Sequence, residues 1–493
     1  MLATQGIRGG ANREVLKRIK EKGDIFFAES DRPWILAGAT VHVSMIGFDR
    51  GAESSRVLDG KSVAHINANL TTQNDLTRAA GLIQNEGLCL RASEKGGHFI
   101  LEEFEALRFL AAVNPHGKPN SDVIRPWTNS DLLLRGIPHK WIIDFFGVTV
   151  EEQAARYEAP FQFLLENVKM DRQSNRDARL AKYWWLHRRS AEDMRVATKR
   201  LARFIVTPSV AKHRTFSWCL QPLLPDHQLY AFAGGEDYLF GILHSRSHEV
   251  WSLAQGTQLR EKESGFRYTP TTCFETFPFP FPDDLAEQPD ELQARLDAAK
   301  HYKHITLREE SAPYSTGHSG NEISQSPAEH HAAIAGAAHE LNELRERWLN
   351  PPEWTVEKIL RFPGRTDGPW RRFLAPKTVD VKTGIGTVRY PRLEPRDAEC
   401  AAKLKTRTLT NLYNERPAWL DWAHKKLDAA VAAAYGWPAD LTDEQILERL
   451  LALNLKRAAE EAQPAEQELA GKRLGNKLKS HKAQREKKAD ELV

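Results

Sequence analysis

Two histidines have the spacing of a metal-binding pair, four residues apart in the stretch HSRSHE. On a helix, His244 and His248 would place both imidazoles on one face, as in zinc sites. No glutamate follows His244 as it does in H-E-x-x-H, and no nearby cysteine offers a third ligand. We therefore interpret the pair as ordinary helix-face histidines and predict no metal site.

The tripeptide Asn350-Pro351-Pro352 is similar to part of a catalytic motif used by DNA methyltransferases that act on amino groups. In that motif the Asn side chain and a Pro carbonyl hold the target amino group, and an aromatic fourth residue stacks on the flipped base. Here the fourth residue is Glu353, which cannot stack, and Trp354 comes one place too late. We interpret the proline pair as the start of a helix and predict no catalytic residue in this chain.

Glycine-rich loops that cradle phosphates are missing from the sequence. It contains neither G-x-x-x-x-G-K-[ST] nor G-x-G-x-x-G. Gly384 and Gly386 in TGIGT have no long apolar strand before them and no helical pattern after them, which is typical of a turn. The sequence alone therefore leaves any cofactor-binding residues unknown.

One concentrated basic and polar surface is predicted between residues 203 and 282. Arginine can donate two parallel hydrogen bonds to a guanine edge, and lysine or histidine can reach phosphate. A run of charges is also typical of a solvated face, so composition alone leaves both interpretations open. The candidate DNA-contact residues are Lys212, His213, Arg214, Arg246, Arg260, Arg267 and Tyr268.

Composition indicates a folded protein of several domains. The chain has 493 residues, of which 41% are hydrophobic and 27% charged. No run approaches the ~20 apolar residues that cross a bilayer, and no signal-peptide pattern opens the sequence. The four cysteines lie far apart, which fits a reducing compartment. We expect a cytoplasmic protein that does not bind membranes.

The net charge of +3 gives no global attraction to nucleic acid. Charge is concentrated between Lys472 and Lys488, where eight Lys and Arg residues stand against one Glu. We interpret this segment as a solvated, fraying helix, with a tail that follows DNA phosphates as the alternative.

Periodicity predicts the elements that would hold these residues. Residues 1–50 indicate a helix from Asn12 to Lys22 and strands at Asp24–Ser30 and Ala39–Phe48, like the trailing edge of a doubly wound sheet. The stretch KWIIDFFG predicts a short buried strand. Helix starts with capping residues are expected at Thr149 with Glu152, at Ser190 with Asp193, and at Thr442 with Gln445.

Eight segments of the sequence, taken in order, resemble one protein family. They are GIRGGANREVLKRI, GDIFFAESDRPWILAGATVHVSMIGFD, NPHGKPNSDVIRPW, WIIDFFG, EEQAARYEAPF, RFIVTPSVAKHRTFSW, DYLFGILHSRSHEVWSL and RYTPTTCFETFPFPFP. The family is the large MmeI-like class of bacterial restriction–modification and phage-defence DNA adenine methyltransferases. The resemblance covers most of residues 1–282, and LDAAVAAAYGWP with LLALNLKRA is similar to the family's C-terminal segment.

The resemblance implies a division of labour. In the family, a methyltransferase domain with an S-adenosyl-L-methionine loop and an N-P-P-aromatic motif comes first, and this sequence resembles only the segments C-terminal to both. No catalytic residue can therefore be assigned to a position here. The resemblance implies that S-adenosyl-L-methionine is bound mainly by an N-terminal methyltransferase polypeptide, and that this chain recognises double-stranded DNA.

Together these observations predict an α/β plus α+β chain. Its parts would be the incomplete last strands of a methyltransferase sheet, a helix-rich connecting region, a β-rich target recognition domain, a helix with a flexible linker, a helical C-terminal domain and a basic tail. Their boundaries are 1–60, 61–202, 203–282, 283–328, 329–460 and 461–493.

The predicted function is target recognition within a site-specific DNA adenine methyltransferase whose catalytic half is a separate polypeptide. The isolated chain is then expected to be inactive. The alternative is a DNA-binding specificity subunit without catalysis, or a decayed methyltransferase fragment.

Overall fold

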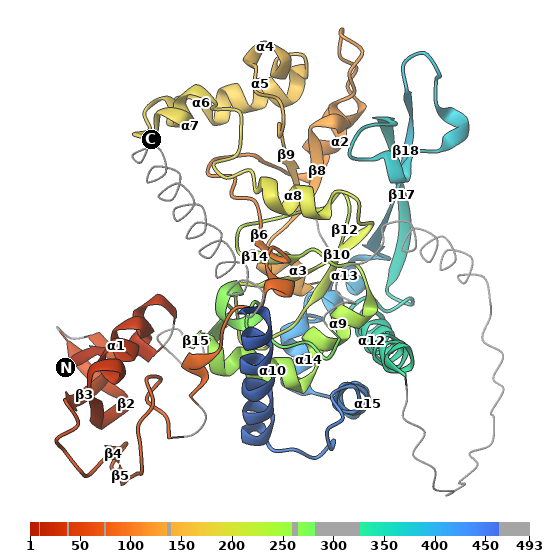
Figure 1. Ribbon diagram of the computed structural model, residues 1–493. Coiled ribbons are helices and arrows are strands. Elements are labelled where there is room, and N and C mark those ends of the chain that lie inside the picture. Colours follow the sequence, from red (N-terminus) through yellow and green to blue (C-terminus); the bar gives the residue numbers. More distant parts are fainter. Residues whose placement is uncertain are drawn as a thin grey trace, which may run out of the picture.

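The computed structural model describes residues 1–8, 10–36, 39–72, 75–135, 140–258, 265–281 and 326–462 (Figure 1). Several sequence predictions lie outside these ranges. They are the DNA contact at Arg260, the linker up to residue 325 and the basic segment from Lys472 to Lys488.

The described residues up to 72 form a small N-terminal body. The predicted helix is present as α1 (Glu14–Lys22), preceded by short turns η1 (Gln5–Arg8) and η2 (Gly10–Arg13). A five-stranded sheet has the order β1-β3-β2-β4-β5. Its strands are β1 (Leu2–Thr4), β2 (Asp24–Leu36), β3 (Ala39–Asp49), β4 (Val57–Leu58) and β5 (Lys61–Ser62).

The two strands predicted from residues 24 to 48 are confirmed, and they pair as an antiparallel hairpin. β1 also runs antiparallel to β3, whereas β4 runs parallel to β2. The place of this sheet at the edge of a larger doubly wound sheet stays a prediction. A compact aliphatic core that includes Leu16, Ile25 and Ile46 holds α1 against the sheet.

The centre of the molecule is built on an antiparallel sheet of order β12-β10-β14-β6. Its strands are β6 (Cys89–Arg91), β10 (Arg203–Pro208), β12 (Ser217–Leu220) and β14 (Leu229–Phe232). Side chains of a strand alternate between faces. On β10, Ile205 therefore packs into one core while Phe204 and Val206 pack into another.

A second four-stranded sheet has the order β13-β8-β9-β7. Its strands are β7 (Ile100–Leu101), β8 (Ile124–Thr128), β9 (Lys140–Ile143) and β13 (Leu224–Pro225). β9 confirms the buried strand predicted from KWIIDFFG. Both central sheets combine strands from before and after residue 203, because β6 pairs with β14 and β8 pairs with β13. Residues 61–202 are therefore more than a helical connector.

Short helices surround these sheets. They are η3 (Leu76–Arg78), η4 (Ile83–Asn85), α2 (Glu103–Ala111), η5 (Asn120–Asp122), α3 (Ser130–Arg135), α4 (Glu151–Ala154), α5 (Glu158–Asn167), α6 (Lys169–Gln173), α7 (Ala178–Lys182) and α8 (Glu192–Thr198).

Two of the predicted helix caps are wrong. α4 begins after Val150 and α8 after Ala191, and neither start has a side-chain cap. At α8 the chain enters the helix through Ala191 in the left-handed conformation, with φ 53°. The carbonyl of Ser190 accepts a hydrogen bond from Arg195 Nε at 2.6 Å. This bond satisfies the Ser190 carbonyl and leaves α8 without a side-chain cap.

Helices pack on one face of the central sheet (Figure 1). They are α9 (Asp237–His244), α10 (Arg246–Gln255), α12 (Pro327–Leu349), α14 (Leu409–Glu415), α15 (Ala418–Ala434) and a helix over 443–462, whereas α13 (Ala398–Leu404) lies beside the strand over 385–395. Thr442 and Gln445 cap the helix over 443–462 reciprocally, at 2.9 and 3.3 Å, which confirms that predicted start.

Gly241 marks the closest approach in this helical layer. A Cβ atom placed on it would lie 2.8 Å from Ile334, 3.0 Å from Ala338 and 3.2 Å from Leu427. α9 therefore packs directly against α12 and α15, at a distance that only glycine allows without movement of its neighbours.

The helical prediction for residues 329–460 is wrong for its middle part. A long antiparallel hairpin, β17 (Thr355–Arg365) and β18 (Ile385–Pro395), projects there, with short turns η9 (Arg371–Phe373) and η10 (Pro376–Thr378) between its strands (Figure 1). Gly384, with φ +67°, is the turn residue expected from TGIGT. Trp370 anchors this region, fully buried, with its Nε1 donating to the carbonyl of Ile124 at 3.0 Å.

The Asn350-Pro351-Pro352 stretch ends a helix instead of starting one. Asn350 is the C-terminal cap of α12, and β17 begins at Thr355. Proline cannot continue the hydrogen bonding of a preceding helix, so the pair terminates α12.

Candidate nucleic-acid interface

The two histidines with metal-binding spacing lie inside the helical core, on either side of Ser245. His244 accepts hydrogen bonds at Nε2 from Arg345 (2.6 Å) and from the backbone of Phe216 (3.2 Å), and donates from Nδ1 to Phe240 (3.1 Å). His248 donates from Nδ1 to Leu243 and accepts at Nε2 from Tyr268, each at 3.0 Å. Both rings therefore have structural partners at each nitrogen. Over the ranges that the structure describes, no cluster of three metal-ligating side chains occurs.

Burial keeps these imidazoles neutral. It lowers the pKa of His248 to about 3 and that of His244 well below its ordinary value. Neutral rings can serve as both donor and acceptor, which is what the hydrogen bonds of each require.

The basic tripeptide Lys212-His213-Arg214 follows β11 (Val210–Ala211) and divides into two roles. Lys212 is exposed and His213 is partly buried, and both reach the side-chain oxygen of Asn414 on α14 at 2.8 Å. Arg214 is only 8% exposed. Its guanidinium donates to the carbonyls of Pro208 and Phe266 and lies over the ring of Tyr268.

Arg214 and Tyr268 thus hold the loop from within. The small sheet β11-β16-β15 positions this loop, with β15 (Thr257–Gln258) and β16 (Phe266–Arg267) completing it. Tyr268 is 1% exposed. The structure therefore places both residues where they shape the surface that Lys212 and His213 present.

Arg246 braces the helical layer. Its guanidinium donates to Asp443 at 2.6 and 3.0 Å and to the carbonyl of Leu441 at 2.9 Å, and its backbone N–H donates to Asp428 at 2.7 Å. These contacts join the start of α10 to α15, to the last helix and to the chain between those two helices.

Arg267 is exposed on β16. A second exposed arginine, Arg91, lies near the same tyrosine, Tyr230, and sequence reasoning did not identify it. Arg91 on β6 stands directly opposite Tyr230 on β14. Burial raises the pKa of Tyr230, and both Arg91 and Arg267 are close enough to oppose that shift. Within the described ranges, neither arginine has an acidic ion-pair partner. No local signal could have identified Arg91, because only the pairing of β6 with β14 brings it here.

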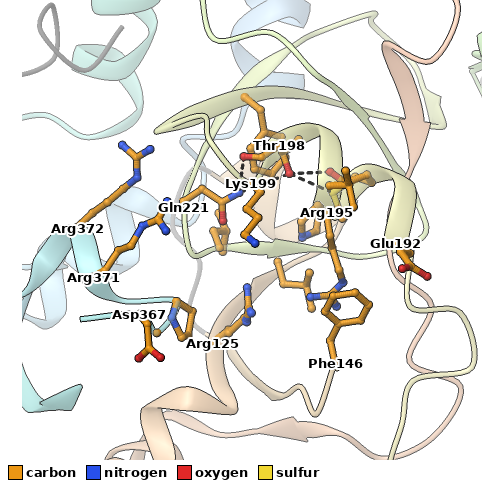
Figure 2. Close-up of a pocket in the computed structure, with 18 residues that line it drawn as sticks. Arg125, Phe146, Glu192, Arg195, Thr198, Lys199, Gln221, Asp367, Arg371 and Arg372 are labelled. Atoms are coloured by element: carbon orange, nitrogen blue, oxygen red, sulfur yellow. Dashed lines mark hydrogen bonds between the residues drawn. The ribbon is translucent and has the colours of Figure 1, made fainter. Parts of the chain in front are cut away.

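A separate pocket of about 420 Å³ opens between the two four-stranded central sheets and the chain around η9 (Figure 2). α8, the loop after β9, the β12–β13 connection and the chain around η9 line it. Its cationic lining residues are Arg125, Arg195, Lys199, Arg371 and Arg372, and its acidic ones are Glu192 and Asp367. Apolar side chains such as Phe204 and Leu224 form the rest of the wall.

A buried carboxylate fixes two of these arginines. Asp144 accepts both terminal nitrogens of Arg195, at 2.8 and 3.0 Å, and lies 3.0 Å from Nε of Arg125. Burial alone would raise the pKa of Asp144, but Arg195 and Arg125 together hold it far below its ordinary value. Two permanent cations therefore share one anion, and the cluster keeps a net positive charge.

The glycine-rich turn at Gly6 is the one place near the N-terminus where a cofactor loop could be sought. A Cβ on Gly6 would meet only Thr4 and Asn12, at 3.8 and 4.0 Å, which are ordinary contacts. A phosphate cradle needs glycine because the backbone must approach its ligand closely. Gly6 therefore shows no close approach of the kind that a phosphate cradle needs.

Comparison with known proteins identifies the central body. Residues 91–281 match the family model described as MmeI, target recognition domain, which confirms the predicted resemblance for this part. A solved structure of the Type IIL restriction–modification enzyme MmeI in complex with DNA has a similar fold, with a TM-score of 0.58 and 16% identity. The match covers 93% of this chain and 49% of that one, so the chain spans about half the length of that enzyme. No curated protein matches.

Proposed function

Residues 91–281 carry an MmeI-type target recognition domain, and from this premise we propose that the chain selects the DNA site for a restriction–modification enzyme. The proposal rests on one observation. The residues that match the target recognition domain include the basic loop formed by Lys212, His213 and Arg214. Lys212, His213, Arg267 and Arg91 are the contacts that we assign to DNA. Arg214 and Tyr268 hold the loop in shape.

The finer proposal is that the enzyme is a DNA adenine methyltransferase that uses S-adenosyl-L-methionine. The sequence has no cofactor loop and no complete N-P-P-aromatic motif, and Gly6 shows no close approach of the kind that a phosphate cradle needs. The residues that bind the methyl donor and act on adenine would therefore come from a methyltransferase polypeptide outside these 493 residues.

Selection of bound duplexes from a random pool tests the coarser proposal. We expect one short sequence to be enriched, because side chains that reach base edges discriminate by about 1–3 kcal/mol per pair. The variant Lys212→Gln/Arg267→Gln should lose that enrichment or weaken binding at least tenfold. Arg32→Gln/Lys61→Gln, two exposed cations on the N-terminal body, removes the same charge and should bind as the wild type does.

A pool that returns without enrichment would contradict target recognition. The methylation proposal needs a second assay, in which the chain is mixed with the candidate methyltransferase polypeptide, DNA and labelled methyl donor. Site-specific DNA binding without labelled adenine in that mixture would favour the non-catalytic specificity subunit.

A further inference from the structure

The pocket between the two central sheets and the chain around η9 holds two cations, Lys199 and Arg125, with donor nitrogens available to an anion. Figure 2 shows Lys199 and Arg125 pointing into the same space from opposite sides. In the part of the chain that the structure describes, no acidic side chain pairs with Lys199, and the terminal nitrogens of Arg125 donate to no residue. Arg371 at the mouth of the pocket likewise has no acidic partner there.

The acidic lining residues do not neutralise this space. Asp367 pairs with Arg365 at 2.7 Å, and Glu192 lies at the opposite end of the pocket from Arg371 and Arg372 (Figure 2). Asp144, behind the wall, is already shared between Arg125 and Arg195. The five cationic lining side chains therefore exceed the nearby carboxylates.

Two parts of the pocket wall are held in place. Arg195 lies over the ring of Phe146 at 4.4 Å, and both its terminal nitrogens are fixed by Asp144. Trp370 fixes the chain beside Arg371 to the carbonyl of Ile124, one residue from Arg125 on β8. A preformed cationic site loses little side-chain entropy when an anion binds.

We propose that this pocket binds a phosphate group that is attached to a sugar and base. Arginine and lysine recognise phosphate oxygens through charge-assisted hydrogen bonds, and the apolar wall suits the sugar. The phosphate belongs either to the backbone of DNA beside the recognised sequence or to a free nucleotide. The first source rests on the proposed function, whereas the second does not.

The pocket would extend the contact with DNA beyond the basic loop that contains Lys212 and His213. Arg371 and Arg372 come from outside residues 91–281, so the C-terminal part of the chain contributes to the site. Phosphate contacts of this kind position a protein on DNA without reading sequence.

The variant Lys199→Gln/Arg371→Gln tests the proposal in the full chain, because both residues are exposed and their loss should not disturb the core. Arg347→Gln/Lys405→Gln removes the same charge from exposed positions elsewhere and is the matched control. Two measurements are made on each protein: the salt dependence of duplex DNA binding, and calorimetric titration with adenosine monophosphate.

A DNA source predicts a smaller salt slope for the pocket variant, by about 0.9 for each phosphate that the variant no longer neutralises, with the sequence preference unchanged. A free-nucleotide source predicts adenosine monophosphate binding that the variant loses and the control keeps. Wild-type salt slope in the variant, together with no nucleotide binding by the wild type, overturns the proposal. If the wild type binds no DNA, the proposed function fails and the nucleotide titration alone decides the pocket.

Discussion

The N-terminal body and the larger body formed by residues 75–462 bury different kinds of side chain. The first has a small core of aliphatic residues, among them Leu16, Ile25 and Ile46. The second has two cores rich in aromatic rings, including Trp141, Trp251 and Trp370. A large aromatic side chain removes 150–250 Å² from water, roughly, so the second body gains far more from burial.

The N-terminal body also leaves several large apolar side chains in water. Trp34, Ile35 and Phe48 on its hairpin are 39%, 76% and 45% exposed. Arg13 links it to the larger body, with Nη1 donating to Gln255 on α10 at 3.2 Å. The comparison indicates that core burial stabilises the larger body more, so we expect the N-terminal body to depend more on its contacts with it.

Lowering the pH should produce the largest difference in stability between the two bodies. Burial lowers the pKa of His187 to about 4 and those of His248 and His424 to about 3. As pH falls, these imidazoles take up protons in the unfolded chain before they do so in the folded one. The free energy of unfolding is therefore unaffected above pH ~6.5 and decreases by ~3 kcal/mol for each group as pH falls toward 4.

Asp428 opposes this trend in part, because burial raises its pKa to about 6 and its folded form gains from protonation. In the N-terminal body, burial raises the pKa of Asp24, but Lys20 and Arg56 lower it more. Its contribution is therefore lost only below pH ~4. Hydrogen exchange at pH 7 and 4.5, corrected for intrinsic rates, should show protection falling in β10 and not in β2. Equal loss of protection in β10 and β2 would contradict this prediction.

Trp370→Ala should give the next largest effect. The indole is fully buried against Phe362 and Tyr390, so its removal leaves a cavity and should cost about 3–5 kcal/mol. Urea unfolding followed by tryptophan fluorescence measures the loss. Trp422→Ala, at a side chain that is 70% exposed, should change stability by less than about 0.5 kcal/mol. Comparable losses in both variants would show that Trp370 does not anchor the hairpin.

Arg13→Ala should give a smaller and more local effect. It leaves Gln255 Oε1 without this donor and should cost about 1–3 kcal/mol of docking. Limited proteolysis should then cut the N-terminal body faster, while DNA binding by the recognition loop is retained. Arg18→Ala, on the exposed face of α1, is the control. Unchanged proteolysis of the Arg13 variant would mean that other contacts hold the two bodies together.

Sequence reasoning succeeded for several local features, although the caps predicted at Thr149 and Ser190 were wrong. The helix ending at Lys22, the two strands after it and the Thr442 cap follow from periodicity and capping rules. It failed where distant segments meet. The pairing of β6 with β14, the hairpin after Pro352 and the burial of Arg214 depend on tertiary contacts that no single stretch encodes.

The same limit applies to the candidate site. Lys212 and His213 could be named because they are adjacent in a polar loop, but their sequence neighbour Arg214 could not be distinguished from them. The pocket around Lys199 was missed because its cations come from separate segments that meet only in the folded chain.

The close contact at Gly241 constrains how this protein can be rebuilt. α9 falls within residues 91–281, whereas the helices that touch Gly241 come from the chain after it. If residues 91–281 alone were grafted into a related enzyme, α9 would pack against that enzyme's own helices. A larger side chain on those helices opposite Gly241 would then prevent the close packing. Swapping DNA specificity between relatives should therefore transplant α12 and α15 together with the segment that reads the site.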